Sequence, residues 1–168
     1  MSTFPFLEVL MREDVISWYN YFMLIAEAVS KRSKDPSKQV GSCIVDDDNH
    51  ILSTGYNGFP RGCSDEVFPW IKTSDDPTKN KYMYVVHSEM NAILNAHKDL
   101  RGSTIYVTLF PCNECAKAII QAGIKKVIYK DFNPKSKDMN YASSHMFQAA
   151  GVEVEKYVPA NLSFTFEV

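Results

Sequence analysis

Residues 106–117 read Y-V-T-L-F-P-C-N-E-C-A-K, and this stretch decides the fold. Its apolar first half predicts a strand, and its second half predicts a helix with Pro111 at the first helical position, where the missing N–H costs nothing. Cys112 and Cys115 then lie on one side of the first turn. The helix dipole and the free N–H groups favour thiolates there. Two thiolates supply half of a zinc site, so the other ligands must come from elsewhere in the chain.

The size and composition of the chain are those of an ordinary globular protein. It has 168 residues, 45% of them apolar, and a net charge of −2. We therefore expect a single domain over residues 1–168 with a core at about 9–158. No broad basic footprint indicates a nucleic-acid partner, and no apolar run indicates a membrane span. Four cysteines without a secretory leader favour a reducing, cytoplasmic location over a disulfide framework.

Hydrophobic spacing predicts an α/β fold. The predicted helices span residues 9–31, 87–98, 112–122 and 141–150. The predicted strands span residues 40–45, 50–56, 104–109, 125–129 and 152–158. The first two strands form an antiparallel hairpin around the acidic turn 46–49, which we interpret as a solvated turn rather than a cation site. The later alternation of helices and strands implies parallel strands, so we expect a mixed sheet with helices on both faces.

The segment G-Y-N-G-F-P-R-G-C at residues 55–63 has two interpretations on composition alone. Its glycines and proline suit a loop that only reverses the chain. Its backbone N–H groups, the Asn57 amide and the Arg61 fork equally suit sugar hydroxyls and phosphate.

Cys63 has no partner at ligand spacing, so we interpret it as structural rather than as part of a second metal site. Residues 64–84 form a long polar loop, and such loops are often functional.

His87-Ser88-Glu89 supplies the missing half of the metal site. With His87 as the third ligand beside Cys112 and Cys115, one tetrahedral position stays open, which is typical of a catalytic zinc. Positions i and i+2 of a regular helix point apart, so His87 and Glu89 can face one metal only at a helix entry. The apolar, strand-like pair before His87 supports that placement.

The charge of the site defines the task of Glu89. Zinc with two thiolates is formally neutral and a weak Lewis acid, so a carboxylate must accept the proton of the attacking water. In the alternative, Glu89 ligates the metal and the site is closed and non-catalytic. The pattern H-x-E followed by P-C-x-x-C is the signature of zinc nucleobase deaminases.

Four stretches resemble the deoxycytidylate (dCMP) deaminase family of the cytidine deaminase superfamily. They are S-K-D-P-S-K-Q-V-G at 33–41, G-Y-N-G-F-P-R-G-C-S-D-E at 55–66, H-S-E-M-N-A-I at 87–93 and F-P-C-N-E-C-A-K at 110–117. The resemblance implies a three-layer α/β/α sandwich with a five-stranded mixed sheet. It implies hydrolysis of dCMP to dUMP and ammonia, one zinc ion on His87, Cys112 and Cys115, and proton transfer by Glu89.

The resemblance also implies regulation and assembly. Family members are often homohexamers that dCTP activates and dTTP inhibits with Mg²⁺. It favours the nucleotide-contacting interpretation of the loop, with Asn57 near the substrate sugar. The substrate- or effector-binding residues that we expect are Lys34, Gly55, Tyr56, Asn57, Gly58, Arg61, Gly62, Ser88, Phe110 and Pro111.

The chain departs from the family pattern at several places. Ser88 stands where the family usually has Ala. Phe110 stands where relatives that act on tRNA adenosine or guanine usually have Glu, which favours the dCMP group. Residues 130–134 do not match the typical family loop. Two rival hypotheses follow: a deaminase of another cytosine nucleotide such as dCTP, and a non-catalytic nucleotide-binding regulatory protein with a structural zinc. Glu89 discriminates, because a binding module needs no carboxylate there.

Overall fold

The computed structural model describes residues 13–159. The helices are α1 (Trp18–Ser30), α2 (Ser88–Asn95), α3 (Asn113–Gln121) and α4 (Lys137–Ala150). The strands are β1 (Gly41–Val45), β2 (Ile51–Tyr56), β3 (Thr104–Leu109), β4 (Lys126–Asp131) and β5 (Glu153–Lys156). Two short 3₁₀ helices, Pro77–Lys79 and Lys81–Met83, interrupt the loop before α2. None of the helices in the described part of the chain is long and apolar enough to cross a bilayer.

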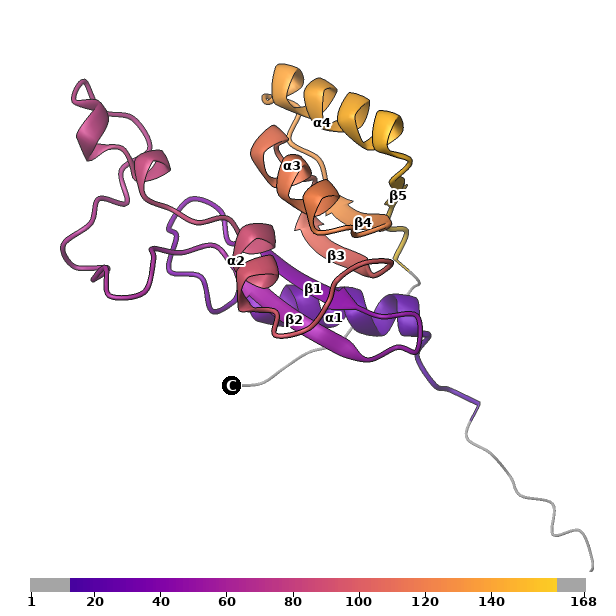
Figure 1. Ribbon diagram of the computed structural model, residues 1–168. Coiled ribbons are helices and arrows are strands. Elements are labelled where there is room, and N and C mark those ends of the chain that lie inside the picture. Colours follow the sequence, from indigo (N-terminus) through magenta and orange to yellow (C-terminus); the bar gives the residue numbers. More distant parts are fainter. Residues whose placement is uncertain (1–12, 160–168) are drawn as a thin grey trace, which may run out of the picture.

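The five strands form one sheet in the order β2-β1-β3-β4-β5. β1 is antiparallel to both β2 and β3, whereas β3, β4 and β5 are mutually parallel. The predicted mixed sheet is confirmed. α1 lies on one face, and α2, α3 and α4 lie on the other (Figure 1). The fold is therefore a three-layer α/β/α sandwich.

The alternation of side chains along the strands builds two cores. Ile44, Ile105, Val107 and Val127 pack with Ala92 of α2, Ala116 and Ile119 of α3, and Phe147 of α4. Their neighbours in the sheet, Cys43, Val45, Tyr106 and Ile128, pack with Phe22, Met23 and Ala26 of α1. Because successive residues of a strand point to opposite faces, Ser42 shares the α2 side of β1 with Ile44.

The ends of several elements differ from the prediction. α1 begins at Trp18 rather than at residue 9, because the Ser17 hydroxyl caps it by accepting the N–H of Asn20 at 3.2 Å. Residues 13–17 are not helical, and residues 9–12 lie outside the described part. α2 ends at Asn95, before an extended Ala96. α4 begins near residue 137, earlier than its apolar spacing predicts, and the Asn140 amide in its first turn donates to the carbonyl of Asn133.

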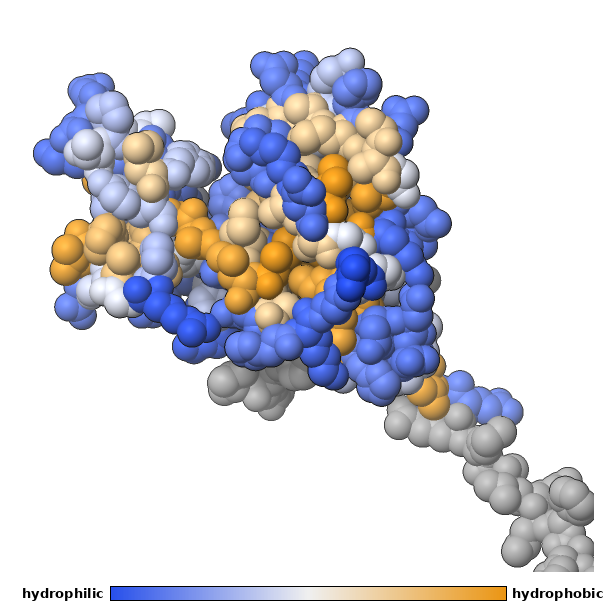
Figure 2. All heavy atoms as spheres, viewed as in Figure 1, coloured by the Kyte–Doolittle hydropathy of each residue, from blue (hydrophilic) through white to orange (hydrophobic). Residues whose placement is uncertain are grey.

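The loop between β2 and α2 projects from the sheet as a lobe, which we define as residues 59–84 (Figure 1). An isolated antiparallel bridge between Gly58 and Val86 closes its base. The Phe59 and Trp70 rings pack at 4.2 Å between centroids, and Phe68 packs against Tyr84 at 5.2 Å. Figure 2 shows apolar surface on this lobe. Its large exposed apolar side chains are Val67, Ile71, Tyr82 and Met83.

Gly55 allows β2 and α2 to touch through their backbones. A Cβ at this position would lie 2.3 Å from the Ala92 nitrogen and 2.3 Å from the Ser88 oxygen. Side chains cannot yield there, because both neighbouring atoms are backbone. The close approach thus fixes the height of the first turn of α2 above the sheet.

We expect Gly55→Ala to lower the free energy of unfolding by about 3 kcal/mol, at the upper end for overpacking, because α2 must move away from β2. Urea denaturation of the purified variant measures the change. Gly58→Ala is the matched control, since the nearest atom to its added Cβ is the Tyr56 side chain at 3.8 Å. Equal stabilities of the two variants would contradict the role of the Gly55 contact.

Candidate metal centre

The starts of two helices meet at one point of the fold. His87 is the N-cap of α2 and Cys112 is the N-cap of α3, both with extended backbone, and neither makes a side-chain capping bond. Cys115 follows in the first turn of α3. The His87 Nδ1 atom lies 3.4 Å from the Cys112 sulfur and 3.5 Å from the Cys115 sulfur. Pro111 therefore precedes the cap, and the prediction that it occupies the first helical position is wrong.

Phe110 fixes the turn that connects β3 to α3. Its N–H donates to the Asp131 carbonyl at 2.8 Å, which holds the chain against the end of β4. Its ring packs edge-on against Tyr129 at 4.8 Å between centroids and against Phe147 of α4. Pro111 is fully buried beside it. These contacts place Cys112 at the carboxyl end of a parallel strand, where ligand sites of open α/β sheets usually lie.

The three donor groups are suited to zinc. All their ligand atoms lie within 4.8 Å of one another, and this is the one such His/Cys/Asp/Glu group found in residues 13–159. Hydrogen bonds from Cys115 and His87 lower the pKa of Cys112 to about 4. The bond to Cys112, together with burial, raises the pKa of Cys115. The hydrogen bonds donated by Cys115 and His87 thus stabilise a thiolate at Cys112, where a soft cation would bind. An imidazole with two thiolates is a zinc donor set that leaves one position open.

Glu89 lies beside this group as the second residue of α2 and is 4% exposed. His87 is extended while Glu89 is helical, so the pair lies at the helix entry as predicted, and the two side chains are close enough for their charges to interact. The carboxylate is not among the donors of the three-residue group. Burial raises the pKa of Glu89 above its ordinary value. A buried carboxylate next to a metal group is suited to take up and release a proton.

The loop 55–62 is joined directly to the metal-binding segment. Gly58 and Val86 exchange two backbone hydrogen bonds, at 3.1 and 2.8 Å, and Val86 precedes His87. The Tyr56 carbonyl accepts the Asn91 amide of α2 at 2.7 Å. Arg61 donates to Asn95 at 2.8 Å, at the opposite end of α2 from His87. Gly62 adopts a left-handed φ of 85°, which a tight turn requires.

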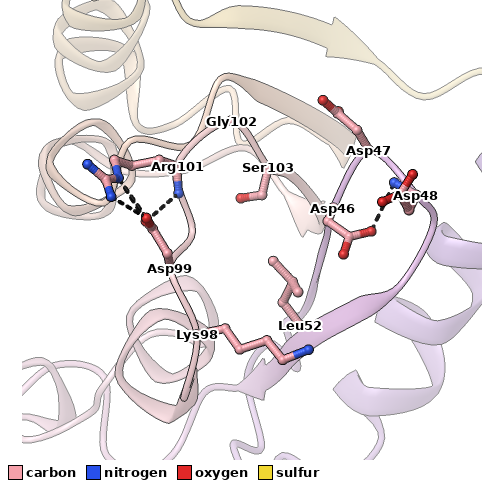
Figure 3. A pocket seen from close by; sticks show the side chains of 9 residues that line it. All are labelled: Asp46, Asp47, Asp48, Leu52, Lys98, Asp99, Arg101, Gly102 and Ser103. Carbon is pink, nitrogen blue, oxygen red and sulfur yellow. Dashed lines mark hydrogen bonds and ion pairs between the residues drawn. The ribbon is translucent and has the colours of Figure 1, made fainter.

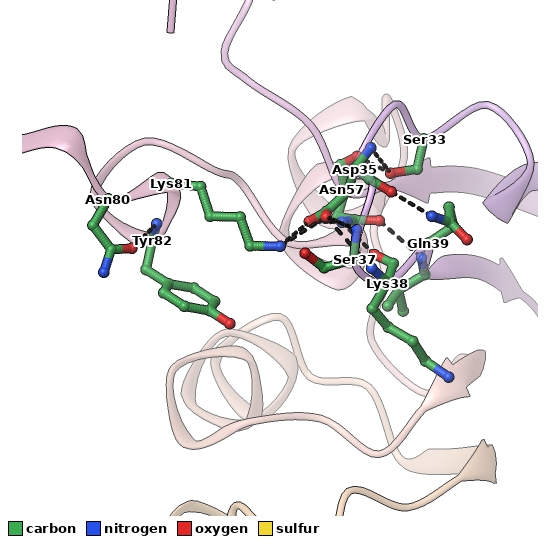
Figure 4. Close-up of polar contacts among 10 residues, drawn as sticks. Ser33, Asp35, Ser37, Lys38, Gln39, Asn57, Asn80, Lys81 and Tyr82 are labelled. Carbon is green, nitrogen blue, oxygen red and sulfur yellow. Dashed lines mark hydrogen bonds and ion pairs between the residues drawn. The ribbon is translucent and has the colours of Figure 1, made fainter. Parts of the chain in front are cut away.

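A buried ion pair stands behind this loop and was not predicted from the sequence. Lys81 of the lobe donates to both carboxylate oxygens of Asp35, at 2.7 and 2.6 Å, and both side chains are 4% exposed (Figure 4). The Asn57 amide donates to Asp35 and to the Lys38 carbonyl and accepts the Val40 N–H at 2.8 Å. Lys34 instead forms an exposed ion pair with Asp65 at 2.6 Å. The network ties the lobe to the segment before β1.

An acidic depression of about 460 Å³ lies at the other end of the sheet (Figure 3). Asp46 there accepts the N–H groups of Asp48 and His50, so the acidic triplet forms the predicted turn. β1 runs antiparallel to β3, and Val45 pairs with Thr104. The turn therefore lies beside the start of β3, far from the donors that follow its end.

The chain resembles known proteins over most of its length. The family model "Cytidine and deoxycytidylate deaminase zinc-binding region" matches residues 16–131. The deoxycytidylate deaminase of Homo sapiens is 49% identical over 149 residues, which cover 88% of this chain and 84% of that protein. A probable deoxycytidylate deaminase of Drosophila melanogaster is 49% identical over 162 residues, which cover 93% and 80%. The dCMP deaminase of the cyanophage S-TIM5, solved with dCMP and dUMP, superimposes with a TM-score of 0.64 at 30% identity, covering 82% and 94%.

The fold, the donor group and these relatives together define a zinc-dependent deaminase, which is a hydrolase. The chain belongs to the deoxycytidylate deaminase family, within the cytidine and deoxycytidylate deaminase zinc-binding superfamily.

We expect Lys81→Met to cost about 3–5 kcal/mol of folding free energy, because it leaves the Asp35 carboxylate buried without its cation. The matched control is Lys79→Met, whose partner Asp76 lies 3.9 Å away in an exposed pair and should change stability by less than about 1 kcal/mol. Thermal and urea unfolding of both variants give the comparison. A Lys81→Met protein as stable as the control would show that the buried pair does not hold the lobe.

We expect Cys115→Ala to lower the zinc content well below one ion per chain, because two of three protein donors remain. Elemental analysis of the purified variant gives the stoichiometry. Cys63→Ala is the control and should retain the metal, since Cys63 lies outside the donor group. Full zinc in Cys115→Ala would refute the ligand assignment, and a loss of zinc in Cys63→Ala would indicate a second site.

Proposed function

We propose that this protein hydrolyses dCMP to dUMP and ammonia, with one zinc ion held by His87, Cys112 and Cys115 and with Glu89 as the proton carrier. One zinc-dependent deaminase domain over residues 1–168 performs this reaction. The observation that carries the proposal is the burial of Glu89 beside an open three-donor group. The family membership of the chain and the dCMP and dUMP bound to the cyanophage relative support the choice of substrate.

When bound, zinc supplies a Lewis acid that activates the attacking water. Glu89 accepts the first proton of that water and transfers it to the ring nitrogen of the base. It then accepts the second proton and delivers it to the amino group, which leaves as ammonia. The carboxylate ends the cycle ionised, as it began. Its raised pKa suits both steps, because a carrier must bind a proton and also release it near neutral pH.

The nucleotide contacts are proposed from the loop and the β3–α3 turn. These residues are Gly55, Tyr56, Asn57, Gly58, Phe110 and Pro111, together with the backbone of Ser88 at the start of α2, since the Ser88 hydroxyl is buried against Ser42 and Glu89. The bridge between Gly58 and Val86 supports this assignment, because it holds the loop against the residue that precedes His87. Both amide hydrogens of Asn57 have protein acceptors and its oxygen already accepts the Val40 N–H, so only the second lone pair of that oxygen remains for a sugar hydroxyl.

The cationic side chains divide by position. Arg61 lies at the far end of α2, and its partner Asn95 is neutral, so its charge suits the phosphates of an effector. Lys34 and the backbone of Gly62 complete the set that we propose for nucleotide phosphates.

Regulation by dCTP as activator and by dTTP with Mg²⁺ as inhibitor is proposed from the family alone.

The assembly proposed for the chain is a homohexamer. The exposed apolar side chains of the lobe support association, because large apolar patches commonly mark protein contacts.

The net charge of −2 fits a small-molecule substrate better than a nucleic acid. The four free thiols support a reducing, cytoplasmic location.

We expect Glu89→Gln to retain zinc and to lower kcat for dCMP by at least about 10²-fold, because the amide cannot accept the water proton. Loss of absorbance by the cytosine ring measures turnover, and elemental analysis measures the metal. Glu114→Gln is the control: it changes an exposed carboxylate in the first turn of α3 and should leave kcat near that of the wild type. Near-normal turnover in Glu89→Gln would remove Glu89 from the mechanism.

We expect a substrate panel to rank dCMP above dCTP and cytidine in kcat/KM, because cytidine lacks the phosphate and dCTP carries two more. Product analysis with and without dCTP or dTTP and Mg²⁺ tests regulation in the same experiment. Equal rates on free cytidine would overturn the substrate proposal, and a preference for dCTP would establish the rival nucleotide. A lack of response to either triphosphate would count against allosteric control alone.

A further inference from the structure

Two buried hydroxyl groups lie behind Glu89. Ser42 of β1 and Ser88, the first residue of α2, are both fully buried, and their Oγ atoms lie 2.8 Å apart. The Ser88 hydroxyl also lies 2.9 Å from Oε2 of Glu89. Ser42 reaches this position because it is on the α2 face of β1. The three side chains form a continuous row from the centre of the sheet to the metal group.

The chemistry of the groups fixes the direction of this row. An ionised carboxylate only accepts hydrogen bonds, so the Ser88 hydroxyl must donate to Glu89. A serine has one hydroxyl hydrogen, and Ser88 has then used it. Ser42 must therefore donate to Ser88. The row is a directed chain from Ser42 through Ser88 to Oε2 of Glu89, inside a region that excludes water.

The chain of hydroxyls occupies one of the two carboxylate oxygens. Oε2 accepts the Ser88 hydroxyl, and the backbone N–H of Glu89 and the Cys115 thiol also lie within hydrogen-bond reach of the carboxylate. A glutamate side chain has several rotatable bonds, and a buried hydrogen bond to one oxygen restricts them. The backbone of both serines is itself fixed, because Gly55 presses β2 against the Ser88 carbonyl and Ser42 pairs with Gly55 across the sheet.

We propose that Ser42 and Ser88 are positioning residues that hold the Glu89 carboxylate through Oε2, so that it is aligned to accept the proton of the attacking water and return it to the base. This inference rests on the proposed function, in which Glu89 is the proton carrier. Neither serine is a proposed metal ligand or the proton carrier, so removal of a hydroxyl should slow the reaction without abolishing it.

The test compares Ser42→Ala, Ser88→Ala and the double variant in zinc-loaded enzyme. We expect Ser88→Ala to lower kcat for dCMP about tenfold with KM within about twofold, because a displaced carrier weakens the transition state more than substrate binding. Ser42→Ala should lower kcat by about threefold. In the double variant the loss should equal that of Ser88→Ala, because Ser42 acts only through Ser88.

The matched control is Ser103→Ala. Ser103 is buried, and its hydroxyl donates to the Leu100 carbonyl at 2.6 Å, at the opposite end of β3 from the metal group. This variant loses a buried serine bond of the same kind and should lower Tm without changing kcat. Losses of kcat that multiply in the double variant, or a kcat of Ser88→Ala equal to that of the wild type, would overturn the proposal.

Crystal structures of the same variants give a readout that does not depend on activity. We expect the Glu89 carboxylate to occupy one position in the wild type and Ser103→Ala, and more than one in Ser88→Ala. An unmoved carboxylate in Ser88→Ala would overturn the positioning role. If the wild-type protein did not deaminate dCMP, or if Glu89→Gln remained active, the proposed function would fail, whereas the carboxylate positions would still decide whether the two serines hold Glu89 in place.

Discussion

The structure depends on two helices that begin with metal donors instead of capping side chains. An N-cap normally supplies an oxygen that accepts free N–H groups of the first turn. His87 and Cys112 occupy those positions without such a bond. The N–H groups of the first turns and the helix dipoles therefore favour negative charge at the point where α2 and α3 meet. A thiolate at Cys112 supplies this negative charge. The same group therefore stabilises the helix starts and provides a ligand that zinc prefers.

Two sets of contacts hold these helix starts in place. Phe110 anchors the entry to α3 through its bond to Asp131 and its packing against α4. Gly55 anchors the entry to α2 through backbone contact with β2. Since the same contacts belong to the core, a change that loosens the core also moves the donors. The core contacts of Phe110 and Gly55 therefore also position the metal donors, so the rigidity of the site follows from that of the sandwich.

The sequence was sufficient for the features that local spacing determines. β3 was predicted with its observed bounds, and the three donors were recognised because each half of the motif lies within a few residues of sequence. The row from Ser42 to Ser88 and the pair of Asp35 with Lys81 were not predicted, because each joins residues 46 positions apart. The start of α1 was missed because apolar spacing continues before Ser17, whose hydroxyl caps the N-terminal end of the helix. Tertiary contacts decide the row and the ion pair, which no local pattern encodes, whereas the Ser17 cap is a local signal that apolar spacing does not register.

The bridge between Gly58 and Val86 makes the lobe modular. The chain leaves the sandwich and returns to it through two adjacent strands of backbone, so residues 59–80, which precede the buried Lys81, can change in length at little entropic cost. Insertions there would not shift His87, which follows the closed base. Evolution could therefore remodel recognition in the lobe while the deamination chemistry stayed constant. For the engineer, the same bridge marks a place where a foreign segment could be grafted onto a finished catalytic frame.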